Sequence, residues 1–371
     1  MFGVAAAGAI LELHAATHRS QRPGAAGRPP GSDARGAGVS VPVAVVGVGN
    51  MGRHHARNYR DLCKDADLRA VVDADVNRAE EIAGPSGARA FTSIEAMLEA
   101  VPEVEAVSVA VPTSAHHEVA RTLLSADKHV LVEKPIAPTV EEIDDLIGLA
   151  KERSRVLAVG HVERFNPAVR QLRRLIDDGK VGEPLSLVAR RVGVMPPQVK
   201  DANVIVDLAV HDIDIFGYLL DDAEPTDLFC NAGRALAEDR FDFADIFLRY
   251  GTVACFLQVN WLTPVKIRSL SVTGTAGYAD VEYVTQRLDY YRGGAAVEPK
   301  SFAELAALSS QQPERLEFPH EEPLARELLE FLRSVRGEPA ETLYAEQARE
   351  TMVVAAKLVA LAESHELARS G

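Results

Sequence analysis

The sequence has few of the features that would place it outside a reducing, aqueous compartment. Its 371 residues include only three cysteines, Cys63, Cys230 and Cys255, and none of them forms a C-x-x-C motif. This pattern speaks against a disulfide framework and predicts small buried thiols, so we expect a cytoplasmic protein. No apolar run approaches the roughly 20 residues of a membrane-spanning helix, so we expect no membrane insertion.

Positive charge is also scarce. The chain carries 40 Lys and Arg residues against 54 Asp and Glu residues, a formal net charge of -14. This balance disfavours nucleic acid and anionic membranes as partners, although it is compatible with a small basic pocket for an anionic ligand. The hydrophobic fraction of 47% suffices for a sizeable core, and the length indicates two domains.

The first forty residues differ in composition from the rest. Residues 1–40 are rich in Gly, Pro, Ala and Arg and have no hydrophobic period, which predicts a disordered leader. Glu12 interrupts the apolar start and no basic segment precedes it, which argues against a secretory signal. An organelle transit peptide is the alternative, although a bland leader or a misplaced start codon explains the segment equally well.

From Val41 onward, short β-branched runs alternate with helical segments. Strands that are apolar on both faces and alternate with helices indicate a parallel sheet covered on both sides. We therefore predict a doubly wound Rossmann domain over residues 41–165. The expected strands are 41–47, 68–75, 105–112, 128–135 and 155–161, and the expected helices are 50–63, 76–83, 114–126 and 139–154.

After about Asn166 the pattern becomes one of hairpins. Two apolar runs bend at Tyr250-Gly251, and another pair turns at residues 274–277, which indicates antiparallel pairing. Two amphipathic helices are expected near the end, over 321–337 and 345–367. The prediction is an α/β chain with a C-terminal α+β domain over residues 166–371.

The stretch VGVGNMG, which joins the first strand to its helix, fits a phosphate-binding loop. Gly47 permits the tight turn, Gly49 lets backbone N–H groups approach a pyrophosphate, and Gly52 allows close packing of the helix. Asp73 ends the next strand, where a carboxylate binds a ribose 2′-hydroxyl and repels a 2′-phosphate. The pattern favours NAD over NADP, and the nearby Arg78 works against that preference. The alternative is a structural glycine turn.

Polar groups follow two later strands, at the edge of the sheet where such folds bind ligands. Glu133 and Lys134 end the strand of VLVEKP, and a lysine there could polarise a carbonyl or alkoxide. His161, Glu163 and Arg164 follow the last parallel strand in GHVERFNP. The alternatives are a surface lysine at a strand end and a solvated linker between the domains.

The stretch VIVDLAVHDIDIFGYLL places charged groups among apolar ones. Asp207 and His211 are four residues apart on an expected amphipathic helix, so they would share a face. Such a pair could take the proton that leaves a hydroxyl as hydride leaves its carbon. Asp214 is expected to pair with a cation at the domain interface. No third ligand is spaced nearby, so no metal is expected.

The chain resembles the Gfo/Idh/MocA oxidoreductases through VGVGNMG, VPTSAHH, VEKP, RFNP and DLAVHDID. The resemblance covers residues from about Val41 to the last helix. It implies a first domain that holds NAD and a second domain with an open, mostly antiparallel sheet whose far face mediates homo-oligomer contacts, in a dimer or tetramer. It also implies a cis Lys134-Pro135 peptide. Ala209 replaces the glycine that many members carry, a mild departure.

The resemblance implies particular site residues. Lys134 and Asp207 would bind the substrate hydroxyl, and His211 would be the acid/base. Thr113 and His116 match the loop beside the nicotinamide ribose. The full set of expected cofactor contacts is Gly47, Gly49, Asn50, Met51, Gly52, Asp73, Pro112, Thr113, His116, Glu133 and Lys134.

A narrower resemblance concerns the substrate. The stretches HVERFNPAVRQL and ARRVGVMPPQVKDANVIVDLAVHDIDI are similar to sugar-nucleotide members, UDP-N-acetylglucosamine 3-dehydrogenases in particular. Arginine suits a diphosphate through bidentate contacts, so Arg164, Arg190, Arg191 and Lys200 are the expected substrate-binding residues. Strand alternation puts Arg190 and Arg191 on opposite faces, so at most one of them points into the site. Exposed strand residues are the alternative.

These observations predict an NAD-dependent dehydrogenase that oxidises a secondary hydroxyl of a sugar or sugar nucleotide, with UDP-N-acetylglucosamine at C3 as the favoured substrate. An inositol or free-sugar dehydrogenase would not need the arginines. An NAD-using glycosidase would cleave glycosides with no net NADH. A non-catalytic nucleotide-sensing regulator could lose Lys134, Asp207 or His211, and all three are present.

Overall fold

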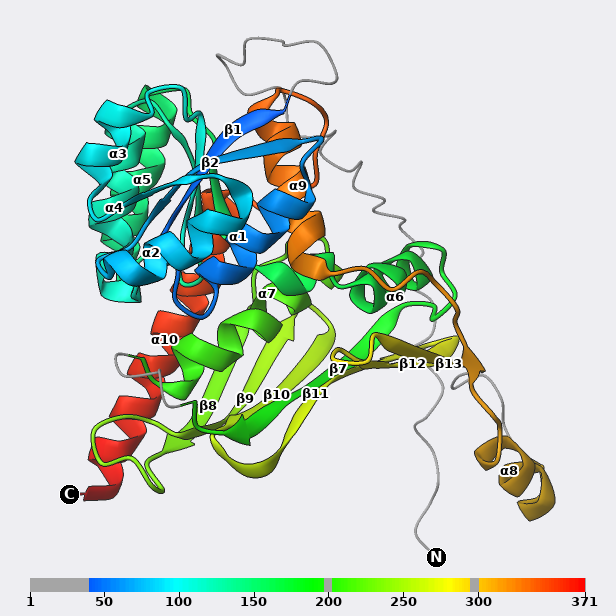
Figure 1. The fold of residues 1–371 in the computed structure, drawn as a ribbon. Helices are drawn as coiled ribbons and strands as arrows, with labels where there is room; N and C mark the ends of the chain where they lie inside the picture. The colour runs from blue at the N-terminus through cyan, green and yellow to red at the C-terminus, as the bar shows by residue number, and fades with distance from the viewer. Residues whose placement is uncertain (1–39, 197–201, 294–299, 371) are drawn as a thin grey trace, which may run out of the picture.

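The computed structural model describes residues 40–196, 202–293 and 300–370, and it builds them into two sheets (Figure 1). Most of the predicted leader and Lys200 lie outside the described residues. One sheet has six strands and the other has eight. The predicted fold class, a Rossmann domain followed by an α+β domain with a mostly antiparallel sheet, is confirmed.

The first sheet has the strand order β3-β2-β1-β4-β5-β6, and all its pairs are parallel. The order reverses between β1 and β4, and a doubly wound sheet binds its ligand outside the carboxyl ends of strands at that point. The strands are β1 (Val41–Val46), β2 (Ala66–Val72), β3 (Arg89–Phe91), β4 (Ala106–Val109), β5 (His129–Glu133) and β6 (Leu157–Gly160).

Helices cover both faces of this sheet because successive strand residues point to opposite sides. Val43 and Val45 pack against one set of helices, and Ala44 and Val46 pack against the other. The helices are α1 (Gly52–Asp61), α2 (Val76–Ala83), α3 (Ile94–Ala100), α4 (His116–Ser125) and α5 (Val140–Glu152). Thr139 caps α5 in a capping box with Glu142, as the sequence indicates. The sequence reasoning missed β3 and α3.

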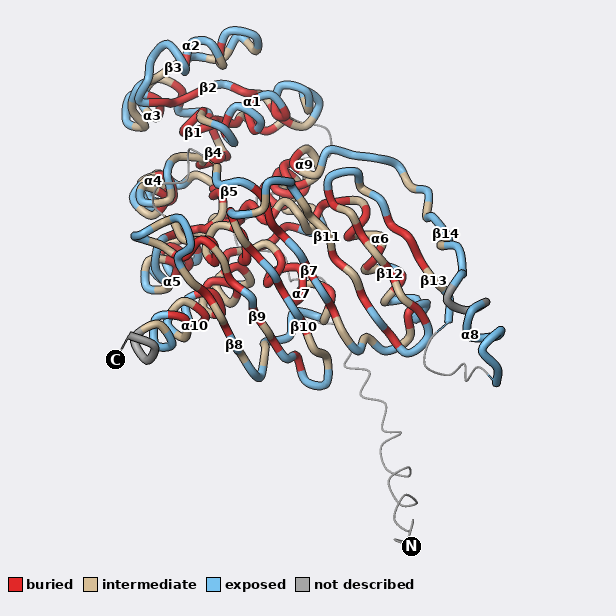
Figure 2. Tube along the Cα trace, turned by 90° about the horizontal axis from the view of Figure 1, so that it is seen from below, coloured by how far each residue is buried: buried red, intermediate tan, exposed pale blue. Residues whose placement is uncertain are grey.

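The second sheet has the order β14-β13-β12-β11-β7-β10-β9-β8, and only the pair of β7 with β10 is parallel. Both predicted hairpins are present. The strands are β7 (Pro184–Val194), β8 (Asp227–Gly233), β9 (Phe243–Tyr250), β10 (Val253–Asn260), β11 (Leu262–Gly274), β12 (Gly277–Glu282), β13 (Arg287–Arg292) and β14 (Glu314–Arg315). Buried and exposed residues alternate along these strands (Figure 2).

Helices of the second half cover one side of this sheet and also reach the first domain (Figure 1). They are α6 (Pro167–Asp177), α7 (Val210–Leu219), α9 (Pro323–Val335) and α10 (Ala345–Ser370). The helix α8 (Phe302–Ser309) projects away from the sheet (Figure 1). Leu328 and Phe331 of α9 belong to the same buried cluster as Val43 and Tyr59. The chain therefore returns from the second sheet to complete the core of the first domain.

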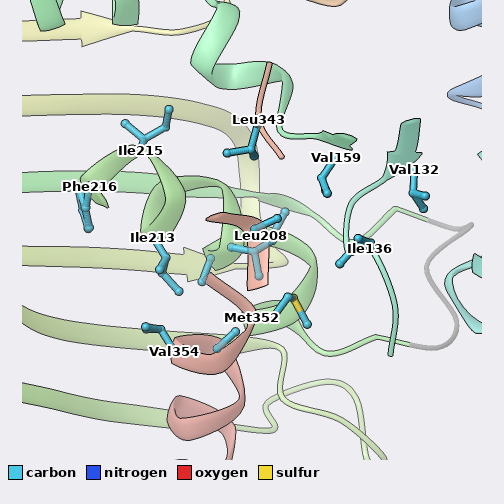
Figure 3. Packing of buried hydrophobic residues seen from close by; sticks show 14 of the residues in the cluster. Val132, Ile136, Val159, Leu208, Ile213, Ile215, Phe216, Leu343, Met352 and Val354 are labelled. Atoms are coloured by element: carbon cyan, nitrogen blue, oxygen red, sulfur yellow. The ribbon is translucent and has the colours of Figure 1, made fainter. Parts of the chain in front are cut away.

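A continuous apolar core joins the two halves beneath the loop that carries Lys134. Val132 and Ile136 flank that loop, and they belong to one cluster with Leu208 and Ile213 of the second half and Met352 of α10 (Figure 3). Close packing of this kind holds both sides of a site between the domains in a defined geometry.

The cysteines fit the sequence expectation only in part. Cys230 and Cys255 are buried free thiols, whereas Cys63 is exposed. The prediction of a buried thiol was wrong for Cys63 because this residue lies just past the end of α1, in a surface turn.

Candidate active site

The glycine loop between β1 and α1 has the geometry that a dinucleotide pyrophosphate requires. Gly47 has φ of 80°, and a Cβ there would lie 2.8 Å from the Ala110 backbone. A Cβ on Gly52 would lie 1.8 Å from the carbonyl oxygen of Gly47, so the helix packs against the turn. A Cβ on Gly49 would meet nothing within 4 Å. The loop is thus tight where it contacts protein and open where a phosphate would approach, and NAD fits it.

Asn50 and Met51 continue this loop, and both are exposed. Met51 is the N-cap of α1 and gives no side-chain cap, so no side chain competes with an anion at this positive helix end. Asp73 follows β2 and accepts hydrogen bonds from Val48 N at 2.8 Å and Asp75 N at 2.9 Å. These bonds hold the carboxylate at the side of the loop, where a ribose would lie.

Arg78 donates from Nη1 to Asp73 Oδ1 at 3.3 Å. Arg78, which was expected to oppose a preference for NAD, is thus paired with Asp73, the carboxylate that favours NAD. Pro112 is exposed and Thr113 is half-buried, at the end of the loop that follows β4. The structure therefore brings the predicted ribose-side residues to the edge of the parallel sheet.

His116 and Glu133 are buried beneath that edge. His116 lies with Nδ1 2.7 Å from Pro135 O and Nε2 2.9 Å from Val111 O, so it ties two loops together. Glu133 Oε1 lies 2.8 Å from His55 Nε2 of α1. Burial would raise the pKa of Glu133, but the contact with His55 outweighs it and the pKa is lowered. Both residues support the loop around Lys134 from below.

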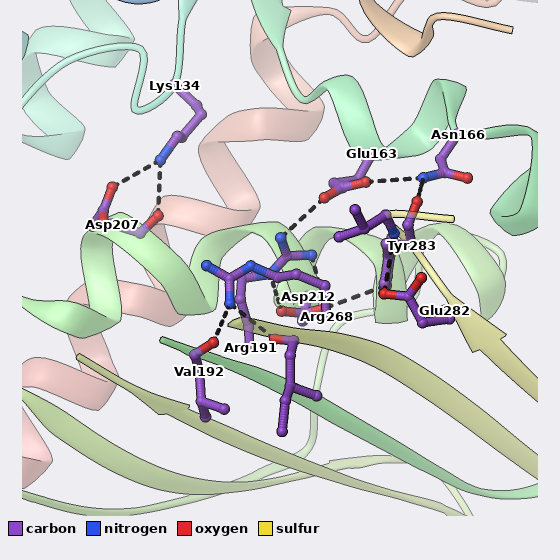
Figure 4. Close-up of polar contacts among 12 residues, drawn as sticks. Lys134, Glu163, Asn166, Arg191, Val192, Asp207, Asp212, Arg268, Glu282 and Tyr283 are labelled. Carbon is purple, nitrogen blue, oxygen red and sulfur yellow. Dashed lines mark hydrogen bonds and ion pairs between the residues drawn. The ribbon is translucent and has the colours of Figure 1, made fainter. Parts of the chain in front are cut away.

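Lys134 and Asp207 form the contact between the domains at this edge (Figure 4). Lys134 Nζ donates to the Asp207 carbonyl oxygen at 2.8 Å and to Asp207 Oδ1 at 3.1 Å. The Lys134-Pro135 peptide is cis, as the resemblance implied. An ammonium has three N–H donors, so one donor of Lys134 remains for a further acceptor.

His211 lies at the start of α7, but Asp207 does not lie on a regular amphipathic helix. Ile205–Ala209 form a π-helical turn, in which Val210 N donates to Ile205 O, and α7 begins after it. The expectation that one α-helix carries Asp207 and His211 was therefore wrong. Asp207 lies in a π turn, which contains more residues than an α turn. Such turns occur frequently at functional sites.

The surroundings of His211 favour its neutral form. Burial lowers the pKa of His211 well below its ordinary value, and the cations of Lys134 and Arg191 lower it further. Its Nδ1 has no hydrogen-bond partner among residues 40–196, 202–293 and 300–370. A neutral imidazole beside an ammonium is equipped to accept a proton, and an ammonium is equipped to stabilise an oxyanion.

The three expected substrate-binding residues that the structure describes are not gathered in one place. Arg190 lies on the exposed face of the second sheet, where Nε donates to Gln258 Oε1 at 3.2 Å. Arg191 points inward, as strand alternation requires, and is buried. Arg164 forms a bidentate pair with Asp214 at 2.8 and 2.9 Å, so the expected pairing of Asp214 with an interface cation is confirmed. Lys200 lies outside the described residues.

A cavity of about 350 Å³ opens beside His211. Arg191 and Glu163 line it, together with residues that the sequence reasoning did not select, namely Lys266, Arg268, Tyr283 and Gln286. A signal for two of them existed. Alternation along β11 gives Lys266 and Arg268 the same strand face as the buried Leu270 and Val272. They are therefore charged residues at positions where the alternation predicts apolar ones.

Within the described part of the chain, no group of three or more His, Cys, Asp or Glu side chains has a metal-binding arrangement. In the same part of the chain, no helix has the length and apolar character needed to cross a membrane.

Comparisons with known proteins agree with this geometry. Residues 41–161 match the model of the oxidoreductase family with an NAD-binding Rossmann fold, and residues 169–280 match the model of the GFO/IDH/MocA C-terminal domain. The first match confirms the NAD prediction.

Individual relatives differ in how much of the chain they match. A UDP-N-acetylglucosamine 3-dehydrogenase of Acidithiobacillus ferrooxidans is 35% identical over 80% of this chain and 89% of its own length. A solved structure of the 3-dehydrogenase from that organism has a TM-score of 0.75, with 30% identity, and covers 88% of this chain and 99% of the other. Inositol 2-dehydrogenase 3 of Saccharopolyspora erythraea is 34% identical over 50% of this chain and 55% of its own length.

Proposed function

Because the chain belongs to the Gfo/Idh/MocA oxidoreductase family, we propose that it is an NAD-dependent dehydrogenase that oxidises a secondary hydroxyl of a sugar nucleotide. The favoured substrate is UDP-N-acetylglucosamine, oxidised at C3. The observation that carries this proposal is the neutral imidazole of His211 beside the Lys134–Asp207 pair, on a cavity between the domains.

Each residue has a distinct role in this proposal. His211 accepts the hydroxyl proton, because burial and neighbouring cations disfavour its protonation before substrate binds. Lys134 donates a hydrogen bond to the substrate oxygen and stabilises the charge that develops on it. Asp207 accepts a hydrogen bond from the Lys134 ammonium and so orients it, and with it the substrate hydroxyl. NAD, when bound, supplies the hydride acceptor.

The phosphate loop aligns the cofactor with these groups. Gly49 leaves room for the pyrophosphate, Asp73 accepts from the ribose, and Thr113 lies where the nicotinamide half would pass. In this arrangement Glu133 and His116 are positioning residues, since they are buried and hold the loops that carry Lys134 and Thr113.

The choice of a sugar nucleotide has two supports. The relative that matches most of this chain is named a UDP-N-acetylglucosamine 3-dehydrogenase, whereas the inositol dehydrogenase above spans about half of it. The cavity is also lined by several cations, which a neutral polyol does not need. An inositol or free-sugar dehydrogenase is therefore the second candidate.

We also propose a homo-oligomer, a dimer or tetramer, that forms through the outer face of the second sheet, and a cytoplasmic location. The outer face carries exposed apolar side chains, among them Val188, Phe229 and Phe256. The buried free thiols of Cys230 and Cys255 fit a reducing compartment.

The test is the appearance of NADH absorbance with purified protein, NAD and a substrate panel. The panel contains UDP-N-acetylglucosamine, UDP-N-acetylgalactosamine, UDP-glucose, myo-inositol and free sugars. A signal confined to UDP-amino sugars is expected. A signal only with inositol or free sugars would replace the substrate class, and glycoside cleavage without net NADH would indicate the glycosidase reaction. NAD binding with no reaction on any compound would favour a sensor.

A further inference from the structure

Two arginines face each other across the centre of the second sheet. Arg268 of β11 is the direct cross-strand partner of Arg191 of β7. Like charges directly opposite each other on one face destabilise a sheet. Such a pair therefore requires compensation by anions.

Arg191 receives this compensation from the protein. Its Nε lies 2.6 Å from Asp212 Oδ2, and its Nη1 lies 3.0 Å from Glu163 Oε1. Its guanidinium carbon also lies 5.1 Å from the ring centroid of Tyr283, and Tyr283 donates to Asp212. The expected phosphate contact from Arg191 would compete with two carboxylates, so Arg191 serves better as a support for the cavity wall (Figure 4).

Arg268 has no ion-pair partner of its own among the described residues. Its Nη1 donates to the carbonyl oxygens of Val192 at 2.6 Å and Ile267 at 2.9 Å. Among the described residues, no carboxylate lies within the 4.0 Å ion-pair distance of Arg268. Burial and then the Arg191 cation lower the pKa of Arg268, and they outweigh the opposing charges of Asp212, Glu163 and Asp207. A guanidinium in this environment gains more from a bound anion than one that is solvated or paired.

A second cation, Lys266, lines the same cavity. Leu262 of β11 pairs with Val194 of β7, and the next paired residue of β11, Ile267, pairs with Val192. The strand β11 therefore has extra residues at this point and forms a bulge. Bulges redirect side chains, and Lys266 lies within this one. Lys266 and Arg268 line the cavity with His211, and the charge of Arg268 contributes to the lowered pKa of His211.

We propose that Arg268, assisted by Lys266, binds the diphosphate of the nucleoside diphosphate sugar whose hydroxyl reacts at His211. The inference rests on the proposed function and assigns the anion contact to β11 in place of Arg190 and Arg191. The Nε and Nη2 groups of Arg268 remain for a bidentate contact, because its protein acceptors in the described part of the chain are bound to Nη1. Lys266 is exposed and contributes less.

The test measures the dissociation constant of UDP by calorimetry, with NAD present, for the wild-type protein and for Arg268→Gln. The matched control is Arg190→Gln, which removes the same charge from the neighbouring cross-strand position on the opposite face of the sheet. Arg268→Gln should weaken UDP binding by about tenfold or more, since a charged hydrogen-bond donor is lost. Arg190→Gln should leave the affinity within about twofold, and Lys266→Gln should weaken it severalfold.

Folding and substrate class are checked separately. Arg268→Gln removes one of two facing cations, so its melting temperature should not fall, and NAD affinity should be retained. If Arg268→Gln does not fold, Arg268→Lys replaces it in the test, because lysine keeps the charge. The affinity of Arg268→Lys for UDP should lie between those of the wild type and Lys266→Gln, because the bidentate geometry is lost. Unchanged UDP affinity in Arg268→Gln, or equal losses in Arg268→Gln and Arg190→Gln, would overturn the inference and leave the proposed function standing. A wild-type protein that oxidises neutral sugars and binds no UDP would overturn both.

Discussion

At the scale of single residues, the site uses the different environments of three side chains. Lys134 is fixed by two acceptors on Asp207, whereas Nδ1 of His211 has no hydrogen-bond partner in the described part of the chain. The lysine is thus held in place, and the imidazole is free to receive a proton. The Lys134 ammonium disfavours a second positive charge on His211. Proton uptake by His211 therefore becomes easier when negative charge develops on the substrate oxygen.

Replacement of Lys134 should separate chemistry from cofactor binding. Lys134→Met removes the donor to the substrate oxygen, so kcat should fall by about two to three orders of magnitude, while the Kd for NAD stays within about threefold. The control is Lys151→Met, an exposed lysine of α5 paired with Glu346, which should leave both values unchanged. Retained turnover in Lys134→Met, or loss of NAD binding, would contradict the assigned role.

The pH profile should show the depressed pKa of His211. The base must be neutral, and burial followed by the Lys134 and Arg191 cations lowers its pKa. The acid limb of kcat/KM should therefore lie below pH 6.5, the ordinary value of histidine. Arg268→Gln removes one of the cations and should move this limb upward. An acid limb at or above pH 6.5 in the wild type would be inconsistent with His211 as the base.

The sequence predicted some of these residues better than others. Lys134, Asp207 and His211 stand next to strand ends or apolar runs, where local pattern predicts position. Arg190 and Arg191 were expected on opposite faces, and they are, because alternation is local. Arg268 was missed because its importance depends on Arg191, a residue 77 positions away (268 − 191) in sequence that becomes its neighbour only through β-pairing.

At the scale of elements, α9 is notable because it follows the second sheet yet completes the first domain. Its Glu327 is buried, and neither carboxyl oxygen has a hydrogen-bond partner among the described residues. Burial, and then the charges of Glu133 and Asp214, raise the pKa of Glu327 well above 4.5. The helix is therefore docked with a neutral carboxylic acid inside the core.

Glu327→Gln should stabilise the protein increasingly as pH rises. Above pH 4.5 the unfolded chain loses the Glu327 proton while the folded chain retains it, so the wild type loses stability until the pH passes the raised folded pKa. The amide variant lacks this dependence. The difference in unfolding free energy should grow by up to about 1.4 kcal/mol per pH unit, as measured by denaturant titration at several pH values.

The control for this prediction is Glu99→Gln, which changes an exposed glutamate of α3 and should show a pH-independent difference. A Glu327→Gln difference that stays constant with pH would show that the folded protein carries an ionised Glu327.

Element boundaries followed the sequence where local signals are strong. The helix over residues 76–83 agrees with the structure at both ends. The three-residue β3 is too short to show a period, and it exists because β2 offers it a parallel partner. The π turn before α7 has no signature in the residue pattern.

At the scale of the whole molecule, the outer face of the second sheet is the largest feature that the site does not use. Val188, Phe256, Phe247 and Phe229 are successive cross-strand partners on four neighbouring strands, β7, β10, β9 and β8. They form an apolar row across the sheet. A row of this kind suits burial against a second copy, which supports the proposed homo-oligomer.

A charge in that row should dissociate the oligomer. Phe256→Glu places a carboxylate among the three other apolar side chains, which strongly disfavours burial against a second copy. Light scattering coupled to gel filtration should show a smaller species than wild type. Phe302→Glu changes an exposed phenylalanine of α8 and should leave the mass unchanged. A Phe256→Glu protein with wild-type mass would place the interface elsewhere or exclude one.

The central claim is that hydride leaves C3 of the sugar for the cofactor at the site of Lys134 and His211. The most direct test incubates the protein with NAD and UDP-N-acetylglucosamine that carries deuterium at C3, and then measures the mass of the reduced cofactor. The account predicts a reduced cofactor heavier by one deuterium, and no such gain from substrate labelled at C4. Reduced cofactor without the label, or label transfer from C4, would contradict the account.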